Sequence, residues 1–180
     1  MLGTLLKLLS LLIVVKGMNP DVVMRSAPST VRTAARAVVV RDGRLLAITM
    51  RDREGDFYIL PGGGQLHGEA LTDTLRRETL EEIGVALEPG PLLYVREYIG
   101  KNHGFADEHR NFHQVEIVFR CEAPVGGPLT AGEGKDRRQV GVAWLDLAKF
   151  PTYRFFPAFL KKCVRKGDLV VEPVYWGDLN

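Results

Sequence analysis

Cysteine is scarce in this chain: its 180 residues include two, Cys121 and Cys163. Two cysteines cannot form the disulfide framework that stabilises small secreted domains, so we expect two reduced thiols in a cytoplasmic protein. An excess of charge of one sign is missing as well, since 24 Lys and Arg are balanced by 22 Asp and Glu. The resulting net charge of +2 argues against a broad basic surface for nucleic acid or for a membrane.

A hydrophobic run long enough for a stable membrane span is also missing. The apolar stretch at residues 2–15 contains Lys7 and is shorter than the ~20 residues of a membrane-spanning helix. A signal peptide fits its length, but Lys7 interrupts the stretch and no good small-residue cleavage site follows. An amphipathic surface helix, a later translation start and an added segment stay open. We interpret residues 1–30 as a leader and linker that are not essential.

The rest of the chain, residues 31–180, has the length and composition of one globular domain with its own core. Apolar runs rich in β-branched residues, separated by turn residues, predict strands. These runs are residues 33–40, 45–50, 58–60, 92–99, 115–121 and 140–145, with a last edge strand at 169–174. Asp42 and Gly43, between the first two runs, are a strong hairpin signal.

Two helices complete the pattern. The first is expected at residues 69–83, with Gly84 as its C-cap because glycine readily adopts the left-handed conformation that ends helices. The second is expected at residues 155–165 and capped by Gly167. Strands before, between and after two helices predict an α/β protein with a mixed sheet flanked by helices.

Three glutamates, Glu78, Glu81 and Glu82, fall on nearly one face of the first helix. Side chains three and four residues apart are neighbours on a helix, and like charges there repel by roughly 0.2–0.5 kcal/mol per exposed pair. A divalent cation would turn that repulsion into a binding site, and Mg²⁺ prefers such hard oxygen ligands. The alternative is that the three glutamates simply form a solvent-exposed helix face. The glycine run at residues 62–64 favours instead a bound metal ion that acts on a phosphate compound.

The spacing of these residues resembles the Nudix box, G-x5-E-x7-R-E-U-x-E-E-x-G-U, in which U is a bulky apolar residue. Its positions are filled here by Gly63, Glu69, Arg77, Glu78, Thr79, Glu81, Glu82, Gly84 and Val85. Thr79 is the departure, because the family prefers an aliphatic residue there. We expect this position to face the core, so the threonine should have a small stability cost and little effect on chemistry.

A Nudix resemblance, which extends from about residue 31 to residue 150, implies an α/β/α sandwich with a mixed β-sheet. It also implies a hydrolase that uses Mg²⁺ or Mn²⁺ to cleave a nucleoside diphosphate linked to another group. The implied substrates are a nucleoside triphosphate, a nucleotide sugar, ADP-ribose or a dinucleoside polyphosphate. Many Nudix enzymes are dimers, so a homodimer is a family-level expectation. A nucleotide-sensing Nudix module without catalysis and an isopentenyl-diphosphate isomerase are the alternatives.

The resemblance also assigns roles to residues of the box. By position, the metal ligands would be Glu78, Glu82, Glu81 and a backbone carbonyl near Gly62. Arg77 would orient the glutamates through a charge-assisted hydrogen bond. Glu69, at the start of the helix, would be favoured by the helix dipole and would hold the loop.

The general base and the substrate contacts are less firmly indicated. The base varies within the family, and the candidates here are Glu78 or Glu82, followed by Glu116, Glu133 and Asp136. Glu116 lies in a strand, where it faces either the active site or solvent. Arg36 is a charge in an apolar strand, and it could reach a substrate phosphate or pair with an acid. Tyr58 could stack on a base or pack in the core.

Overall fold

The computed structural model describes residues 30–104, 109–125, 129–130 and 137–180 of the chain. Residues Val31–Asn180 form one compact unit, which holds every element discussed below. Residues 1–29 of the leader and linker expected at 1–30 lie outside the described residues, as do two of the candidate bases, Glu133 and Asp136.

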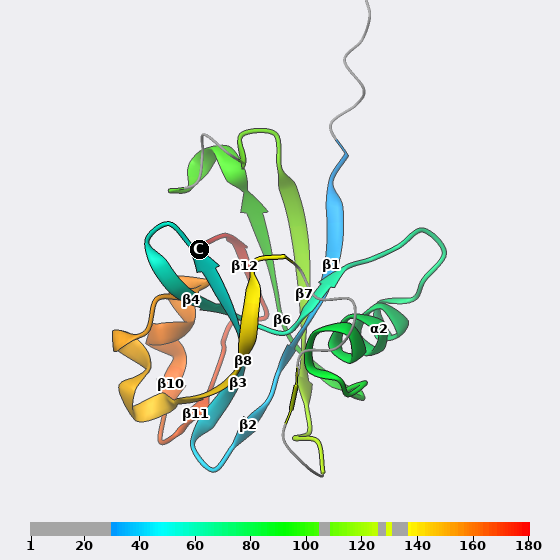
Figure 1. The fold of residues 1–180 in the computed structure, drawn as a ribbon. Coiled ribbons are helices and arrows are strands. Elements are labelled where there is room, and N and C mark those ends of the chain that lie inside the picture. Colours follow the sequence, from blue (N-terminus) through cyan, green and yellow to red (C-terminus); the bar gives the residue numbers. More distant parts are fainter. Residues whose placement is uncertain (1–29, 105–108, 126–128, 131–136) are drawn as a thin grey trace, which may run out of the picture. The chain divides into compact units, whose positions relative to one another are not determined.

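A five-stranded mixed sheet forms the first layer of this unit (Figure 1). Its strands are β1 (Arg32–Val38), β5 (Gly62–Gly64), β6 (Pro89–Ile99), β7 (His113–Cys121) and β12 (Tyr175–Asp178). Their order is β12-β6-β7-β1-β5. β1 is parallel to β7 and antiparallel to β5, while β6 is antiparallel to β7 and parallel to β12. The short β5 therefore brings three glycines to one edge of the sheet.

A second sheet is built around a hairpin. Its strands are β2 (Val40–Arg41), β3 (Arg44–Asp52), β4 (Gly55–Ile59), β8 (Gln139–Asp146) and β9 (Phe155–Phe156). They follow the order β2-β3-β4-β9, and β8 pairs with β3. Asp42 and Gly43 both have positive φ, 50° and 69°, as a type I′ turn requires. The hairpin expected from these two residues is confirmed.

Helix α2 (Leu71–Ile83) lies against β1 and β5 and confirms the first expected helix, with its start two residues later (Figure 1). Leu75, Thr79 and Ile83 are buried along its inner side. Gly84 has a φ of 74° and its N–H donates to the carbonyl of Leu80 at 3.1 Å, so it is the expected C-cap.

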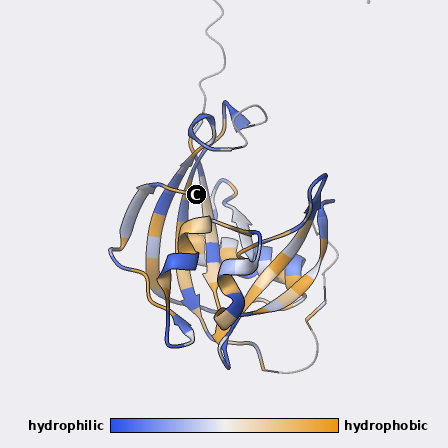
Figure 2. Cartoon of the chain, turned by 90° about the vertical axis from the view of Figure 1, so that its left-hand side faces the viewer, coloured by the Kyte–Doolittle hydropathy of each residue, from blue (hydrophilic) through white to orange (hydrophobic). Residues whose placement is uncertain are grey.

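Two hydrophobic clusters form the core. One joins Leu75 and Ile83 of α2 to Ala35 of β1 and Ile48 of β3. The other contains Tyr94 together with Phe150, Phe155 and Phe159. Hydrophobic segments lie along the strands, while turns and loop tips are mostly hydrophilic (Figure 2). Mixed sheets with a helix packed on them match the expected α/β/α sandwich. None of the helices in the described ranges is both long and apolar enough to span a membrane.

Three short 3-10 helices and a small hairpin complete the unit. They are η1 (Gly100–Asn102), η2 (Leu147–Thr152), η3 (Ala158–Cys163), β10 (Val164–Arg165) and β11 (Asp168–Leu169).

The α-helix expected at residues 155–165 is wrong, because β9, η3 and β10 occupy this segment. Phe155 and Phe156 use their backbone to pair with β4, and this pairing ends at Pro157. Gly167 does not cap a helix. With φ values of 48° at Lys166 and 78° at Gly167, these two residues form the turn between β10 and β11.

The last edge strand expected at residues 169–174 is also wrong in extent, since β11 ends at Leu169. The edge of the first sheet is formed instead by β12, after Pro173. Proline has no N–H to donate to a neighbouring strand, which disfavours pairing at that position.

Candidate active site

The glycine strand β5 lies directly beside α2. It pairs with β1 so that Gly62, Gly63 and Gly64 oppose Arg36, Ala35 and Ala34. Gly62 has a φ of 116°, and a Cβ there would collide with the carbonyl oxygen of Ala35. A Cβ on Gly63 would collide with the carboxylate of Glu78. The absence of side chains therefore lets the carboxylate of Glu78 approach the backbone of β5.

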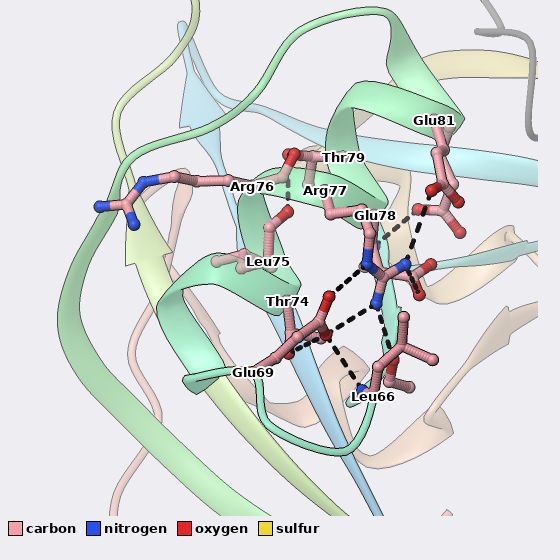
Figure 3. A network of polar contacts seen from close by, with 12 residues as sticks. Leu66, Glu69, Thr74, Leu75, Arg76, Arg77, Glu78, Thr79 and Glu81 are labelled. Atoms are coloured by element: carbon pink, nitrogen blue, oxygen red, sulfur yellow. Dashed lines mark hydrogen bonds and ion pairs between the residues drawn. The ribbon is translucent and has the colours of Figure 1, made fainter.

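Arg77 connects the predicted site residues to one another (Figure 3). Its guanidinium donates to both carboxylate oxygens of Glu69, at 2.7 and 3.0 Å, and to Glu78 Oε1 at 2.7 Å. It also donates to the carbonyl of Gly64 at 3.0 Å and lies 3.6 Å from Glu81 Oε1. The hydrogen bonds to Glu69 are the main reason that the pKa of Arg77 is raised. The structure thus brings together four residues that the sequence singled out.

The carboxylate of Glu69 accepts several hydrogen bonds. Besides Arg77, its carboxylate accepts the N–H of Leu66 at 3.0 Å and the hydroxyl of Thr74 at 2.9 Å. Arg77 first, and then the Leu66 N–H, hold the pKa of Glu69 at about 2. The carboxylate closes the loop before α2 onto the helix, as the sequence predicts.

Glu82 is in the opposite electrostatic situation. Its Oε2 accepts one hydrogen bond, from the Gly62 N–H at 2.6 Å. Burial raises the pKa of Glu82 to about 7 against the lowering effect of Arg36, and the carboxylates of Glu78 and Glu81 act in the same direction as burial. Gln139 fixes the backbone here, since its Nε2 donates to the Glu82 carbonyl at 2.7 Å.

The donors of this site suit a hard divalent cation. Glu78, Glu81 and Glu82 offer carboxylate oxygens, which are the ligands that Mg²⁺ prefers. In the described residues no three His, Cys, Asp or Glu side chains gather tightly enough to hold a metal ion. Glu78 and Glu81 turn toward Arg77, and Glu82 turns toward Gly62. The carbonyl of Gly62, a predicted ligand, accepts a hydrogen bond from Arg36.

Glu116 is buried on the inner face of the first sheet, so the solvent-facing alternative is wrong. Its carboxylate lies 2.6 Å from Arg96 Nε and 3.6 Å from Arg36 Nε, and it accepts from Gln114 at 2.9 Å. Burial alone would raise the pKa of Glu116, but Arg96 and Arg36 hold it below its ordinary value. Arg36 therefore pairs with an acid, one of the two alternatives that the sequence left open.

Tyr58 lies on β4 and packs edge-to-face on Tyr153, with 5.7 Å between the ring centroids. It also packs against the core cluster that contains Tyr94, so its contacts support the core alternative. Stacking on a substrate base stays a prediction.

Three functional contacts were missed at the sequence level. Arg96 binds Glu116, Gln139 binds the end of α2, and the hydroxyl of Thr79 accepts the N–H of Leu87 at 2.9 Å. A charged residue inside an apolar strand is the signal that could have indicated the first of these contacts.

Comparison with known proteins identifies the family to which this arrangement belongs. The sequence signature of the NUDIX domain matches residues 31–166. The chain belongs to the Nudix family. Members of this family generally use a divalent metal ion, in agreement with the carboxylate cluster on α2.

Two solved structures are similar to this chain, one in sequence and fold and the other in fold alone. A MutT NUDIX hydrolase from Burkholderia pseudomallei is 32% identical, with a TM-score of 0.53 over 66% of this chain and 85% of that protein. A NUDIX hydrolase from Nitrosomonas europaea shares the fold at 18% identity, with a TM-score of 0.59 over 74% of this chain and 86% of its own.

The human 8-oxo-dGDP phosphatase NUDT18 is 32% identical over 108 residues. That match covers 60% of this chain and 29% of the human protein, and the mouse protein is matched over 27% of its length. The chain therefore spans less than a third of the curated relatives that it matches.

Proposed function

We propose that this chain is a divalent-metal-dependent Nudix pyrophosphohydrolase that uses Mg²⁺ or Mn²⁺. Its substrate is a nucleoside diphosphate derivative, and the bond cleaved is a diphosphate linkage. The observation that supports this best is the group of three glutamates on α2 beside a strand of glycines. Glu78 lies against Gly63, Glu82 is bonded to Gly62, and Arg77 bridges Glu78 to Glu69.

The residues of the site have separate tasks. Glu78, Glu81 and Glu82 would hold the ion, with Gly62 contributing its carbonyl oxygen. When bound, a divalent cation would neutralise phosphate charge and acidify an attacking water. Arg77 fixes the direction of the Glu78 carboxylate through the 2.7 Å hydrogen bond.

The reaction itself needs a base and a leaving group. The water oxygen forms a bond to phosphorus while the bridging P–O bond breaks, and the departing phosphate takes the electron pair. A carboxylate, Glu78 or Glu82, takes the proton of the water. Positioning and electrostatic stabilisation account for most of the rate in phosphoryl transfer. The rigid contacts of Arg77 and β5 supply that positioning.

The family and one curated relative together define the panel of substrates to test. Nucleoside triphosphates, nucleotide sugars, ADP-ribose and dinucleoside polyphosphates follow from the family. The name of the human relative adds 8-oxo-dGDP, an oxidised nucleoside diphosphate, as a candidate to test.

Hydrolysis of this panel with Mg²⁺ tests the proposal. We expect turnover of at least one class by the wild type and a loss of at least ~10²-fold in Glu78→Gln. Glu88→Gln is the matched control, because Glu88 is exposed and pairs with Arg76 away from the cluster. Binding of a nucleotide without turnover of any member would favour the sensing module, and isomerisation of isopentenyl diphosphate would favour the isomerase.

A further inference from the structure

Arg36 forms hydrogen bonds with the backbone of the segment that leads into β5. Its Nη1 donates to the carbonyl oxygens of both Leu60, at 3.2 Å, and Gly62. Between them, the carbonyl of Pro61 accepts the N–H of Ala37 at 2.9 Å. Three consecutive carbonyl groups are thus bound from β1, two of them by one guanidinium.

These contacts decide where the Gly62 N–H points. Gly62 has no side chain to restrict its backbone, and its φ of 116° is one that other residues rarely adopt. Its conformation therefore depends on what holds the peptide groups on either side. The N–H held in this way donates to Glu82 Oε2 at 2.6 Å, and among the residues that the structure describes it is the one hydrogen-bond donor to that carboxylate.

Arg36 is in turn held by a buried charge. Glu116 Oε1 lies 3.6 Å from its Nε, and the side chains of Arg36 and Glu116 are 17% and 7% exposed. Glu116 is itself fixed by Arg96 at 2.6 Å and Gln114 at 2.9 Å. The planar guanidinium of an arginine can reach a carboxylate and two carbonyls together, whereas the ammonium of a lysine is a single point charge.

We infer that Arg36 is a positioning residue that sets the carboxylate of Glu82 through the Gly62 peptide, with the Glu116–Arg96 pair as its anchor. This inference rests on the proposed function, since it gives Glu82 the role of metal ligand. Groups that orient metal ligands in this indirect way typically change metal affinity by 10–100-fold when they are removed. Arg36 acts here on a ligand and needs no contact with substrate.

The test measures Mn²⁺ affinity by calorimetry and the Gly62 amide resonance by NMR in the full chain. For Arg36→Met we expect metal affinity to fall by ~10-fold or more and the Gly62 resonance to shift. Arg36→Lys keeps the charge beside Glu116 but cannot bind both carbonyls, so its affinity should lie in between. Arg120→Met is the matched control, because Arg120 lies on β7, in the same sheet as Arg36, but pairs with Asp168 of β11. It should leave both readouts unchanged.

The outcomes separate the two proposals. Wild type that neither binds Mn²⁺ nor hydrolyses the panel would overturn the proposed function. Wild type that does both, while Arg36→Lys and Arg36→Met keep wild-type affinity and an unshifted Gly62 resonance, would overturn the positioning role alone. If Arg36→Met does not fold, the comparison of Arg36→Lys with Arg120→Met decides the matter.

Discussion

Two carboxylates, one just before helix α2 and one in its last turn, are in opposite electrostatic surroundings. At the N-terminal end, Glu69 accepts hydrogen bonds from Arg77, Leu66 and Thr74, and its pKa is held at about 2. At the C-terminal end, Glu82 has one N–H donor, and burial raises its pKa to about 7. Both glutamates belong to the same motif, so their difference comes from the surroundings.

The comparison separates structural carboxylates from those available to a ligand. A carboxylate that accepts hydrogen bonds from several donors stabilises the fold, and few of its lone pairs remain free to bind a cation. A buried carboxylate beside other carboxylates is poorly compensated until a positive charge arrives. Arg77 connects the two ends, since it donates to Glu69 and to Glu78. The contacts of Glu69 with Arg77 therefore also help to fix the position of Glu78 at the acidic end of the helix.

The largest expected effect comes from adding one methyl group to β5 beside the acidic end. Gly62→Ala should destabilise the protein by about 2–6 kcal/mol, because its Cβ meets a backbone carbonyl of β1 and its φ becomes strained. In Gly63→Ala the three atoms nearest to the added Cβ all belong to the end of the Glu78 side chain, which can move away. We expect Gly63→Ala to stay folded but to lose Mn²⁺ affinity and hydrolysis. Thermal unfolding and calorimetry measure the two effects.

Gly43→Ala serves as the control for this pair, since nothing lies within 4 Å of its added Cβ although its φ is also positive. Gly43→Ala should lower the stability of the protein because of its positive φ, without any change in metal affinity. Equal metal affinity in Gly63→Ala and wild type would mean that Glu78 does not need its place against β5.

The next largest effect is expected from removing the charge of Glu69 or of Glu82. In metal-free protein at pH 7, Glu69→Gln should lower the melting temperature, whereas Glu82→Gln should leave it unchanged or raise it. Glu69 has a depressed pKa, so its contribution is complete above its ordinary pKa of 4.5 and is lost as the pH falls toward 2. The difference between wild type and Glu69→Gln should therefore shrink between pH 4.5 and 2.

Melting curves in chelator across that pH range check this prediction. Asp73→Asn is the control, because Asp73 is an exposed acid in the first turn of α2 that pairs with Arg76. Similar losses in Glu69→Gln and Glu82→Gln at pH 7 would remove the distinction between the two ends.

Local signals explain what the sequence could predict. The Asp42–Gly43 hairpin, helix α2 and its Gly84 cap each depend on residues close together in the chain. The acidic face follows from helical spacing alone. These features need no knowledge of distant partners, so the sequence was sufficient for them.

The errors and omissions depend on distant partners. Phe155 and Phe156 pair with β4, about a hundred residues earlier, and this pairing replaced the expected second helix. Glu116 is compensated by Arg96 on the next strand, which the sequence alone could not place opposite it. Glycine after a charged residue suits both a helix cap and a hairpin turn, and at Gly167 the partner strand decided between them.

The smallest expected effect concerns Thr79, midway between the two ends and the one departure from the Nudix box. Its hydroxyl donates to the carbonyl of Leu75 at 2.8 Å and accepts the N–H of Leu87 at 2.9 Å. Thr79→Val fills the same space but leaves a buried N–H unpaired, which costs about 1–3 kcal/mol. The hydrogen bond to Leu87 therefore reverses the small stability cost that the sequence led us to expect of the threonine. Thr79→Ser keeps the acceptor and should regain part of the loss. Because neither variant touches the carboxylates, Mn²⁺ affinity should equal that of wild type in both, and a valine variant as stable as wild type would show that the Leu87 N–H finds another acceptor.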